Sequence, residues 1–260
     1  MTDVPKLSMR GVVKRFGGLL ALDHVDFEVR RGEVMALVGD NGAGKSTLIK
    51  ALAGAHAPDE GRIEIDGQAV RFASPEDAWR GGVATIFQEL ALAGKMTVAD
   101  NIFLGREIVR PVAGIPFLDR RAMQRKSREL LDQLDVEIHD VNSTVEYLSG
   151  GQRQGVAIAR ALNIVADLIV MDEPTAALAV AEVRKVLSFI ETLRDQGKSV
   201  VLISHNIQDV FTVADRITVL RRGRNAGLLE TAGTTPEEVV GLITGALAGR
   251  LQATHAHPSP

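Results

Sequence analysis

Gly39-Asp40-Asn41-Gly42-Ala43-Gly44-Lys45-Ser46-Thr47 is the stretch that decides the fold of this chain of 260 residues. It follows a short apolar segment, residues 33–38, that predicts a strand, and it precedes a helical pattern over residues 48–53. In that context the spacing G-x-x-x-x-G-K-[ST] predicts a loop whose backbone N–H groups surround the α- and β-phosphates of a nucleotide. Average residue usage gives this pattern by chance in roughly 1% of chains of this length, which makes an ordinary glycine turn a poor alternative.

The residue types of this loop have different expected tasks. Lys45 is expected to reach the β- and γ-phosphates, and Ser46 to offer its hydroxyl to Mg²⁺. A strand, a glycine loop and a helix in this order are typical of an α/β fold built around a parallel sheet. The predicted nucleotide-binding residues of the loop are Gly39, Asn41, Gly42, Gly44, Lys45, Ser46 and Thr47.

The composition narrows the class of protein. Apolar residues make up 45% of the chain, and the formal net charge is −3, so no overall field would hold the protein on nucleic acid, although a local basic patch stays open. The absence of cysteine excludes disulfides, thiol catalysis and cysteine-ligated metal. No apolar run reaches the ~18–20 residues of a membrane span, and residues 239–249 predict a packed C-terminal helix instead. We therefore expect any membrane role to come through a partner.

Apolar patterning predicts most of the strands. Residues 7–16, 22–29 and 62–65 alternate between apolar and polar residues, which is typical of strands with one solvated face. Later apolar runs, at residues 168–171, 200–203 and 217–220, are unbroken, as in parallel strands that are buried on both faces. A helical pattern over residues 181–196 separates the first two of these runs. We therefore predict a mixed or parallel sheet core with flanking helices and an N-terminal antiparallel β part.

Between residues 91 and 166 the pattern becomes helical. Asp119 is a predicted N-cap, and leucines repeat at helical spacing between residues 130 and 134. Pro111 and Pro116 are expected to bracket a loop before this helix. The basic run over residues 120–128 is interpreted as a solvated helix face rather than a nucleic-acid patch. We predict a single domain, residues 1–250, with a core formed by residues 1–90 and 166–250, an inserted helical subdomain over about 91–165, and a disordered tail at 251–260.

Two carboxylates, Asp172 and Glu173, follow the apolar run at residues 168–171. Two acids at the tip of a buried strand repel each other and lose hydration. A Mg²⁺ ion held by Asp172, through water, relieves this and leaves Glu173 as a base or water-orienting group beside the γ-phosphate. The alternative is a strand end whose acids are merely exposed to solvent. This alternative is disfavoured because the chain also contains a complete phosphate loop.

Three further residues carry weak signals when each is considered alone. Gln88 follows the predicted strand 83–87, where it could coordinate Mg²⁺ or the attacking water, although most glutamines are surface residues. His205 follows residues 200–203 and could hydrogen-bond the γ-phosphate and hold Glu173 in position, whereas a lone histidine is usually structural. Phe16 could stack on adenine or belong to the core, and the sequence leaves both open.

A second glycine turn stands at Leu148-Ser149-Gly150-Gly151-Gln152. Its two adjacent glycines let the backbone come close to a ligand without a Cβ in the way. The serine hydroxyl and the free N–H groups of a following helix then face an anion. The loop at residues 39–47 is already expected to bind the phosphates of one nucleotide. This second turn therefore needs another phosphate, or a phosphate shared with another copy of the chain. It therefore indicates a protein that works in pairs.

Together these motifs resemble the ATP-binding cassette (ABC) family, in the family's order and over nearly the whole chain. The resemblance implies ATP and Mg²⁺ as cofactors, and a head-to-tail homodimer in which each ATP touches Walker A of one chain and the signature turn of the other. It also implies that the helical subdomain contacts a transmembrane partner. The family positions are Phe16 for adenine stacking, residues 39–47 for Walker A, Gln88 for the Q-loop, Ser149, Gly150, Gly151 and Gln152 for the signature, residues 168–172 for Walker B, Glu173 for the catalytic carboxylate and His205 for the switch histidine.

One position departs from the family pattern. After residues 172–175 the family usually continues Ser-Ala-Leu-Asp, whereas this chain has Ala176-Ala177-Leu178-Ala179. The resemblance implies that the usual aspartate spans the dimer interface and helps to couple the two ATP sites. Ala179 cannot make that contact, so communication between the sites is in question.

Further stretches resemble the bacterial importers of monosaccharides of the ribose, xylose and fructose type, in the form with one cassette per chain. They are residues 16–25, 87–90, 96–107 and 144–147, together with the loop that lacks its aspartate. The resemblance implies a cytoplasmic ATPase, peripheral on the inner face of the membrane. Its partners would be an integral membrane permease and, indirectly, a periplasmic sugar-binding protein, with no nucleic acid.

Two alternative functions stay open. One is an importer for another small solute such as an amino acid, which differs only in the choice of partner. The other is a soluble ABC ATPase of DNA repair or translation. Such proteins usually carry long coiled coils, zinc motifs or a second cassette, and this sequence has no cysteine, no sustained heptads and one phosphate loop.

Overall fold

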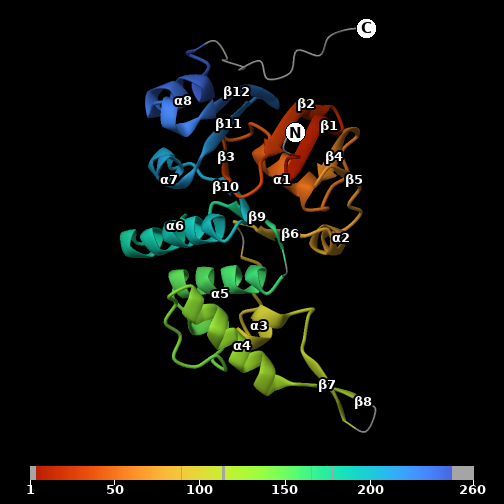
Figure 1. The fold of residues 1–260 in the computed structure, drawn as a ribbon, viewed down its shortest axis with the longest axis vertical. Coiled ribbons are helices and arrows are strands. Elements are labelled where there is room, and N and C mark those ends of the chain that lie inside the picture. The colour runs from red at the N-terminus through yellow and green to blue at the C-terminus, as the bar shows by residue number, and fades with distance from the viewer. Residues whose placement is uncertain (1–3, 89, 113–114, 165, 177, 248–260) are drawn as a thin grey trace.

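The computed structural model describes residues 4–88, 90–112, 115–164, 166–176 and 178–247. Figure 1 shows a β-rich part that contains two sheets and, at the opposite end, a part in which helices α3, α4 and α5 lie together. The tail predicted at residues 251–260 lies outside the described residues, as does Ala177.

The central sheet has six strands in the order β12-β11-β3-β10-β9-β6. All neighbours pair in parallel except β12, which runs antiparallel to β11. The predicted mixed sheet with flanking helices is thereby confirmed, although the sequence did not indicate β12. The strands are β3 (Val34–Gly39), β6 (Val83–Ile86), β9 (Leu168–Asp172), β10 (Ser199–Ile203), β11 (Arg216–Arg221) and β12 (Arg224–Glu230).

A second sheet, with the order β2-β1-β4-β5, is antiparallel throughout. Its strands are β1 (Leu7–Phe16), β2 (Leu19–Val29), β4 (Glu60–Ile65) and β5 (Gln68–Val70). The turn at residues 66–67 joins β4 to β5, which pair as an antiparallel hairpin. Figure 1 shows this sheet beside α1, on the side of the molecule away from α6.

Eight α-helices are present in the described part of the chain: α1 (Lys45–Leu52), α2 (Pro75–Arg80), α3 (Val98–Phe103), α4 (Arg120–Gln133), α5 (Gly150–Leu162), α6 (Val180–Asp195), α7 (Ile207–Val213) and α8 (Pro236–Thr244). Asp119 is the N-cap of α4, as predicted, because its Oδ1 accepts a hydrogen bond from the N–H of Ala122 at 3.0 Å. A side-chain cap of this kind satisfies one of the N–H groups that the first turn of a helix leaves free.

The region around Pro111 and Pro116 is a correction to the sequence analysis. The expected loop is a hairpin of two strands, β7 (Val109–Val112) and β8 (Ile115–Leu118), in which the two prolines lie opposite each other. Proline lacks the N–H of a ladder bond, but in a two-stranded ribbon each strand is an edge strand and tolerates it. The expected helical region 91–166 therefore contains a β-hairpin that projects beside α4 (Figure 1).

Two buried clusters explain why the central strands are apolar on both faces. In β3, Val34, Ala36 and Val38 belong to one cluster and Met35 and Leu37 to the other. Alternate side chains of a strand point to opposite faces, so both faces of β3 are covered.

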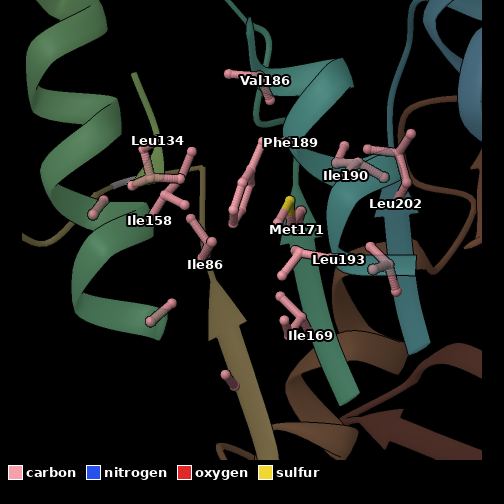
Figure 2. Close-up of a cluster of buried hydrophobic side chains, with 14 of the residues drawn as sticks. Ile86, Leu134, Ile158, Ile169, Met171, Val186, Phe189, Ile190, Leu193 and Leu202 are labelled. Carbon is pink, nitrogen blue, oxygen red and sulfur yellow. The ribbon is translucent and has the colours of Figure 1, made fainter. Parts of the chain in front are cut away.

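The first of these clusters joins the helical part to the central sheet. Figure 2 shows Ile158 of α5, Phe189 of α6 and Ile86 of β6 in the same cluster as Met171 of β9. The apolar side of α5 thereby packs against the ends of β6 and β9. The turn that begins α5 is positioned relative to the sheet by these contacts.

An ion pair between two buried side chains lies inside the described part of this fold. The Arg216 guanidinium lies 3.2 Å from the Glu33 carboxylate, and the two side chains are only 4% and 7% exposed. Burial raises the pKa of Glu33, whereas its hydrogen bond from the backbone of Arg30 and the charge of Arg216 act in the opposite direction. The pair joins the start of β3 to the start of β11.

Removal of one partner should leave the other as an uncompensated buried charge. We expect Arg216→Ala to lower the free energy of unfolding by about 3–5 kcal/mol, measured by urea denaturation at pH 7. A carboxyl whose folded pKa is raised stabilises the fold at low pH, and that stabilisation is lost as pH rises through the folded pKa. The loss in Arg216→Ala should therefore shrink as pH falls toward 4.5, the ordinary pKa of Glu33.

Arg80→Ala is the matched control, because the Arg80–Glu76 pair is exposed on both sides. It should change the unfolding free energy little at any pH. An equal loss in the two variants would show that burial does not set the cost of breaking the pair.

Candidate nucleotide-binding site

Strand register brings the candidate groups to one edge of the central sheet. Ile203 pairs with Leu37 on one side and with Asp172 on the other, and Ile86 pairs with Met171. The carboxyl ends of these parallel strands therefore meet at one edge, where ligands of open α/β sheets bind. Gly39, Gln88, Asp172, Glu173 and His205 all lie at or within two residues of these strand ends.

The glycine loop follows β3 directly and leads into α1 at Lys45. Gly39 has φ +155°, and a Cβ there would lie 2.3 Å from the carbonyl oxygen of Leu220. Gly44 has φ +105°, and its Cβ would lie 2.9 Å from the carbonyl oxygen of Ala21. Both positions need glycine because a Cβ would clash with a backbone carbonyl oxygen of a neighbouring strand. The loop is thereby held between β11, β2 and α1, with its N–H groups ahead of the helix.

Lys45 is buried at the start of α1, with 6% of its surface exposed. Its Nζ donates hydrogen bonds to the carbonyl oxygens of Gly39 at 2.7 Å and Asp40 at 3.1 Å. Burial lowers the pKa of Lys45, and the nearby charges of Glu173 and Asp172 oppose that shift. The loop therefore holds the Lys45 ammonium beside its backbone, close to the carboxylates of Asp172 and Glu173.

The two carboxylates differ in their surroundings. Burial, and next the charge of Glu173, raise the pKa of Asp172, whereas Lys45 and His205 lower it. The Glu173 side chain is 13% exposed and its Oε1 is in close contact with Nε2 of His205. Glu173 has φ +53°, a conformation rare for a residue with a side chain, and its N–H donates to the carbonyl oxygen of Ile203 at 2.9 Å. The bond holds this unusual turn against the end of β10.

Gln88 and Phe16 lie at the margins of this group. Gln88 is exposed, two residues past the end of β6. Phe16 is 43% exposed at the end of β1, and its ring meets the edge of the His56 ring at a centroid distance of 5.5 Å. It is therefore not a core residue, and its aromatic ring is of the kind that stacks on a base. Nζ of Lys14 lies over this ring, 5.5 Å from its centroid.

The second glycine turn begins α5 with a reciprocal cap. The Ser149 hydroxyl accepts a hydrogen bond from the N–H of Gln152 at 3.2 Å, and Oε1 of Gln152 accepts one from the N–H of Ser149 at 3.0 Å. This capping box leaves the N–H groups of Gly150 and Gly151 pointing from the helix start. Figure 1 shows α5 in the helical part and α1 in the β-rich part, so the two glycine turns of one chain lie apart.

Glu182 is a neighbour of this turn that sequence reasoning missed. A Cβ on Gly151 would lie 2.0 Å from Oε1 of Glu182, so the carboxylate lies directly against this glycine. Its Oε2 accepts a hydrogen bond from the N–H of Ala179 at 3.1 Å. Glu182 stands three residues after Ala179, the N-cap of α6, which is where a capping carboxylate stands. The sequence analysis placed the start of this helix at residue 181, so the signal was missed.

Ala179 is the N-cap of α6 and offers no side-chain acceptor to the first turn. Aspartate at this position would accept from the free N–H groups and place a negative charge at the positive end of the helix. We expect Ala179→Asp to raise the free energy of unfolding of the nucleotide-free chain by about 1 kcal/mol, measured by urea denaturation.

The matched control is Ala181→Asp, which adds the same charge two residues inside α6 without the N-cap geometry. Its gain should be smaller. No gain in Ala179→Asp, or an equal gain in both variants, would contradict the capping argument.

A strand, a phosphate loop and a helix at one sheet edge, with two carboxylates at the end of β9, which is separated from β3 by β10, define a P-loop nucleotide hydrolase. The comparison with family models is more specific: residues 22–176 match the model described as ABC transporter. The chain belongs to the ABC transporter family, and it is an ATP-binding ATPase of that family. The fold expected from the sequence is thereby confirmed.

Similar proteins are import ATP-binding proteins. The chain is 48% identical to the fructose import ATP-binding protein of Rhizobium meliloti, over 95% of this chain and 96% of that protein. It is 47% identical to the xylose/arabinose import ATP-binding protein of Sulfolobus acidocaldarius, over 96% and 98%. A ribose import ATP-binding protein of Rubrobacter xylanophilus is 46% identical over 93% of this chain, which spans 47% of that longer protein.

Solved structures agree on the fold. A nucleotide-free ATP-binding cassette from an ABC transporter superposes with a TM-score of 0.77 at 28% identity, over 92% of this chain and 95% of that one. A dimeric cassette in a post-hydrolysis state, bound to ADP and phosphate, gives a TM-score of 0.74 at 25% identity, over 86% and 98%. Among the described residues of the present chain, no helix has the length and apolar character to cross a membrane.

Proposed function

We propose that this chain is the ATP-hydrolysing subunit of a system that imports a monosaccharide. The observation that carries the proposal is the convergence of Lys45, Asp172, Glu173 and His205 at one sheet edge, in a chain whose full-length relatives are named for fructose and for xylose and arabinose import. The subunit would work at the cytoplasmic face, peripheral to the membrane, on a permease that receives its solute from a sugar-binding protein.

The residues at the sheet edge fit a Mg²⁺ ion that is bound together with nucleotide. The described residues hold no group of three or more His, Asp or Glu side chains that could bind a metal without further ligands. Mg²⁺ usually takes one or two protein oxygens and completes its shell with water and substrate phosphates. Asp172 and the hydroxyl of Ser46 would supply the protein oxygens, with Gln88 nearby. The raised pKa of Asp172 reflects a burial cost that a cation would relieve.

Glu173 is the proposed base or water-orienting group. Its carboxylate is largely buried, contacts His205 and faces Lys45. It would accept a proton from the attacking water, or orient that water, while Lys45 and the loop amides stabilise the charge on the phosphates. His205 would hold Glu173 in position and hydrogen-bond the γ-phosphate. When bound, Mg²⁺ would neutralise charge that develops on the β- and γ-oxygens.

The signature turn supports a head-to-tail homodimer. Ser149, Gly150 and Gly151 present a hydroxyl and helix N–H groups to an anion, but they lie apart from the phosphate loop of their own chain (Figure 1). A second copy would bring its own γ-phosphate to this turn. Phe16 would stack on adenine at the other end of the nucleotide.

A bulky cation at the signature turn should disable the ATP site that this turn completes. We expect Ser149→Arg to lower steady-state ATP hydrolysis by more than about tenfold, because it removes the N-cap of α5 and fills the space of the partner's phosphate. The measurement is phosphate release together with the ATP-dependent change in mass by light scattering.

Gln133→Arg, on the exposed end of α4, adds the same charge elsewhere and should leave hydrolysis and mass unchanged. Wild-type hydrolysis and assembly in Ser149→Arg would refute the assignment of this turn.

The choice of solute is tested in cells. Loss of the gene should abolish uptake of one labelled monosaccharide, and the wild-type chain, but not Glu173→Gln, should restore it. Restored uptake of an amino acid instead would favour the alternative importer. A shift of nucleic acid at physiological salt would favour the soluble ATPase class.

A further inference from the structure

The β7–β8 hairpin exposes large apolar side chains on both faces. Val109, Ile115, Phe117 and Leu118 are 57%, 59%, 51% and 48% exposed. Val109 pairs with Leu118 and Arg110 with Phe117, so Val109 and Leu118 share one face, and Ile115 and Phe117 share the other with Arg110. We call Val109, Arg110, Ile115, Phe117 and Leu118 the hairpin patch.

The hairpin patch has no cover within the chain that the structure describes. A hairpin of two strands is at best marginally stable in water by itself, and grouped apolar side chains on a surface mark a place of interaction. Figure 1 shows the hairpin projecting from the helical end of the molecule, away from α1 and the phosphate loop. The patch is therefore separate from the nucleotide site.

Positive charge surrounds this hairpin. Residues 105–128 contain seven arginines and lysines against two acidic residues, a net charge of +5 in a chain whose total is −3. Arg110, Arg121 and Arg125 are exposed and make no ion pair with any residue in the described ranges, and Arg120 approaches Asp100 only to 3.8 Å. We call Arg110, Arg120, Arg121 and Arg125 the arginine cluster.

The base of the hairpin is fixed to the start of α4. The N–H of Asp119 donates to the carbonyl oxygen of Ile108 at 2.7 Å, and Asp119 then caps α4. Arg120 and Arg121, in the first turn of the helix, thereby follow the base of the hairpin directly. An apolar finger with arginines at its base is the pattern of a segment that enters the boundary between lipid headgroups and acyl chains.

We propose that the hairpin patch and the arginine cluster dock this protein on the surface of an anionic lipid bilayer. Both faces of the finger carry large exposed apolar side chains, and lipid can surround a finger, whereas a flat protein surface covers one face. Guanidinium groups bind phosphate oxygens in pairs and suit anionic headgroups. The remaining chain is acidic, so the attraction acts only at this end and orients the molecule. The proposal does not depend on which solute is imported.

Vesicle co-sedimentation tests the proposal on the full chain. Phosphatidylglycerol–phosphatidylcholine vesicles should bind the wild-type protein, and pure phosphatidylcholine vesicles should bind it much less. Ile115→Ser with Phe117→Ser, and separately Arg120→Glu with Arg121→Glu, should each weaken binding at least ~10-fold. Binding should also fall at high salt, because exposed charges are screened.

Matched controls change the same residue types elsewhere. Val240→Ser replaces a half-exposed apolar residue on α8, and Arg71→Glu reverses an exposed charge. Both should bind vesicles as the wild type does. All variants should retain ATP hydrolysis, which shows that they are folded. Equal binding by wild type and hairpin variants, or no binding to anionic vesicles, would overturn the proposal.

A site-specific probe separates lipid from protein docking. The chain has no cysteine, so Phe117→Cys and Val240→Cys each carry a single environment-sensitive dye. The dye at 117 should shift to shorter wavelength with anionic vesicles, and the dye at 240 should not. If the dye at 117 instead shifts with protein concentration alone, while the mass doubles, the hairpin docks on a second copy and the lipid assignment is wrong.

Discussion

Replacement of Glu173 by glutamine is expected to lower ATP turnover by about 10²–10⁴-fold while ATP binding is retained. Glutamine keeps the size of the side chain and its contact with His205, but it cannot accept a proton, and general-base catalysis contributes a factor of this order. The phosphate contacts of the loop do not involve this side chain. Single-turnover hydrolysis and equilibrium binding of ATP measure the two effects separately.

Glu129→Gln is the control for this substitution, because Glu129 is an exposed residue of α4 paired only with Lys126. It should hydrolyse ATP at the wild-type rate. Normal steady-state turnover in Glu173→Gln would mean that another group activates the water, and a loss of ATP binding would mean that Glu173 holds the nucleotide site together.

Lys45→Ala should act on binding itself. The Lys45 ammonium is placed at the mouth of the loop by two carbonyl oxygens, and hydrogen bonds between charged groups contribute about 1.5–3 kcal/mol each. We therefore expect ATP affinity to fall by roughly 10–100-fold, measured by titration calorimetry with MgATP. The pKa of Lys45 is lowered by burial, so loss of its charge should not by itself unfold the nucleotide-free chain.

Lys50→Ala is the matched control on the same helix, where the side chain is exposed. Its ATP affinity and thermal stability should stay close to those of the wild type. An unchanged affinity in Lys45→Ala would count against the whole phosphate-loop interpretation.

The central sheet was predictable because its strands are continuous apolar runs, and the loop at residues 39–47 because its spacing is strict. Where the local pattern of apolar residues is weak, the secondary structure was predicted incompletely. Pro111 and Pro116 indicated a loop, yet a two-stranded hairpin tolerates them. In β12, Asn225 and Gly227 weaken the strand signal, and pairing with β11 decides the outcome.

Contacts between residues far apart in the sequence could not be predicted from local patterns, either in the fold or at the site. The ion pair of Glu33 and Arg216 joins residues 183 positions apart, and no local pattern indicates it. The approach of Glu182 to Gly151 depends on how α6 packs against α5. The roles of Gln88 and Phe16 rested on the motifs around them, because a single glutamine or phenylalanine has no distinctive spacing.

Each ATP site is expected to be built from two chains, and a mixing experiment tests this most directly. Alone, Lys45→Ala and Ser149→Arg should each retain about a tenth or less of the wild-type ATP hydrolysis. In a head-to-tail pair of the two variants, one site receives both defects and the other receives none. Random pairing should then restore roughly a quarter of the wild-type ATP hydrolysis, since half the pairs are mixed and each has one intact site. Restored hydrolysis on mixing is the predicted result, and a mixture as inactive as its components would contradict the shared site.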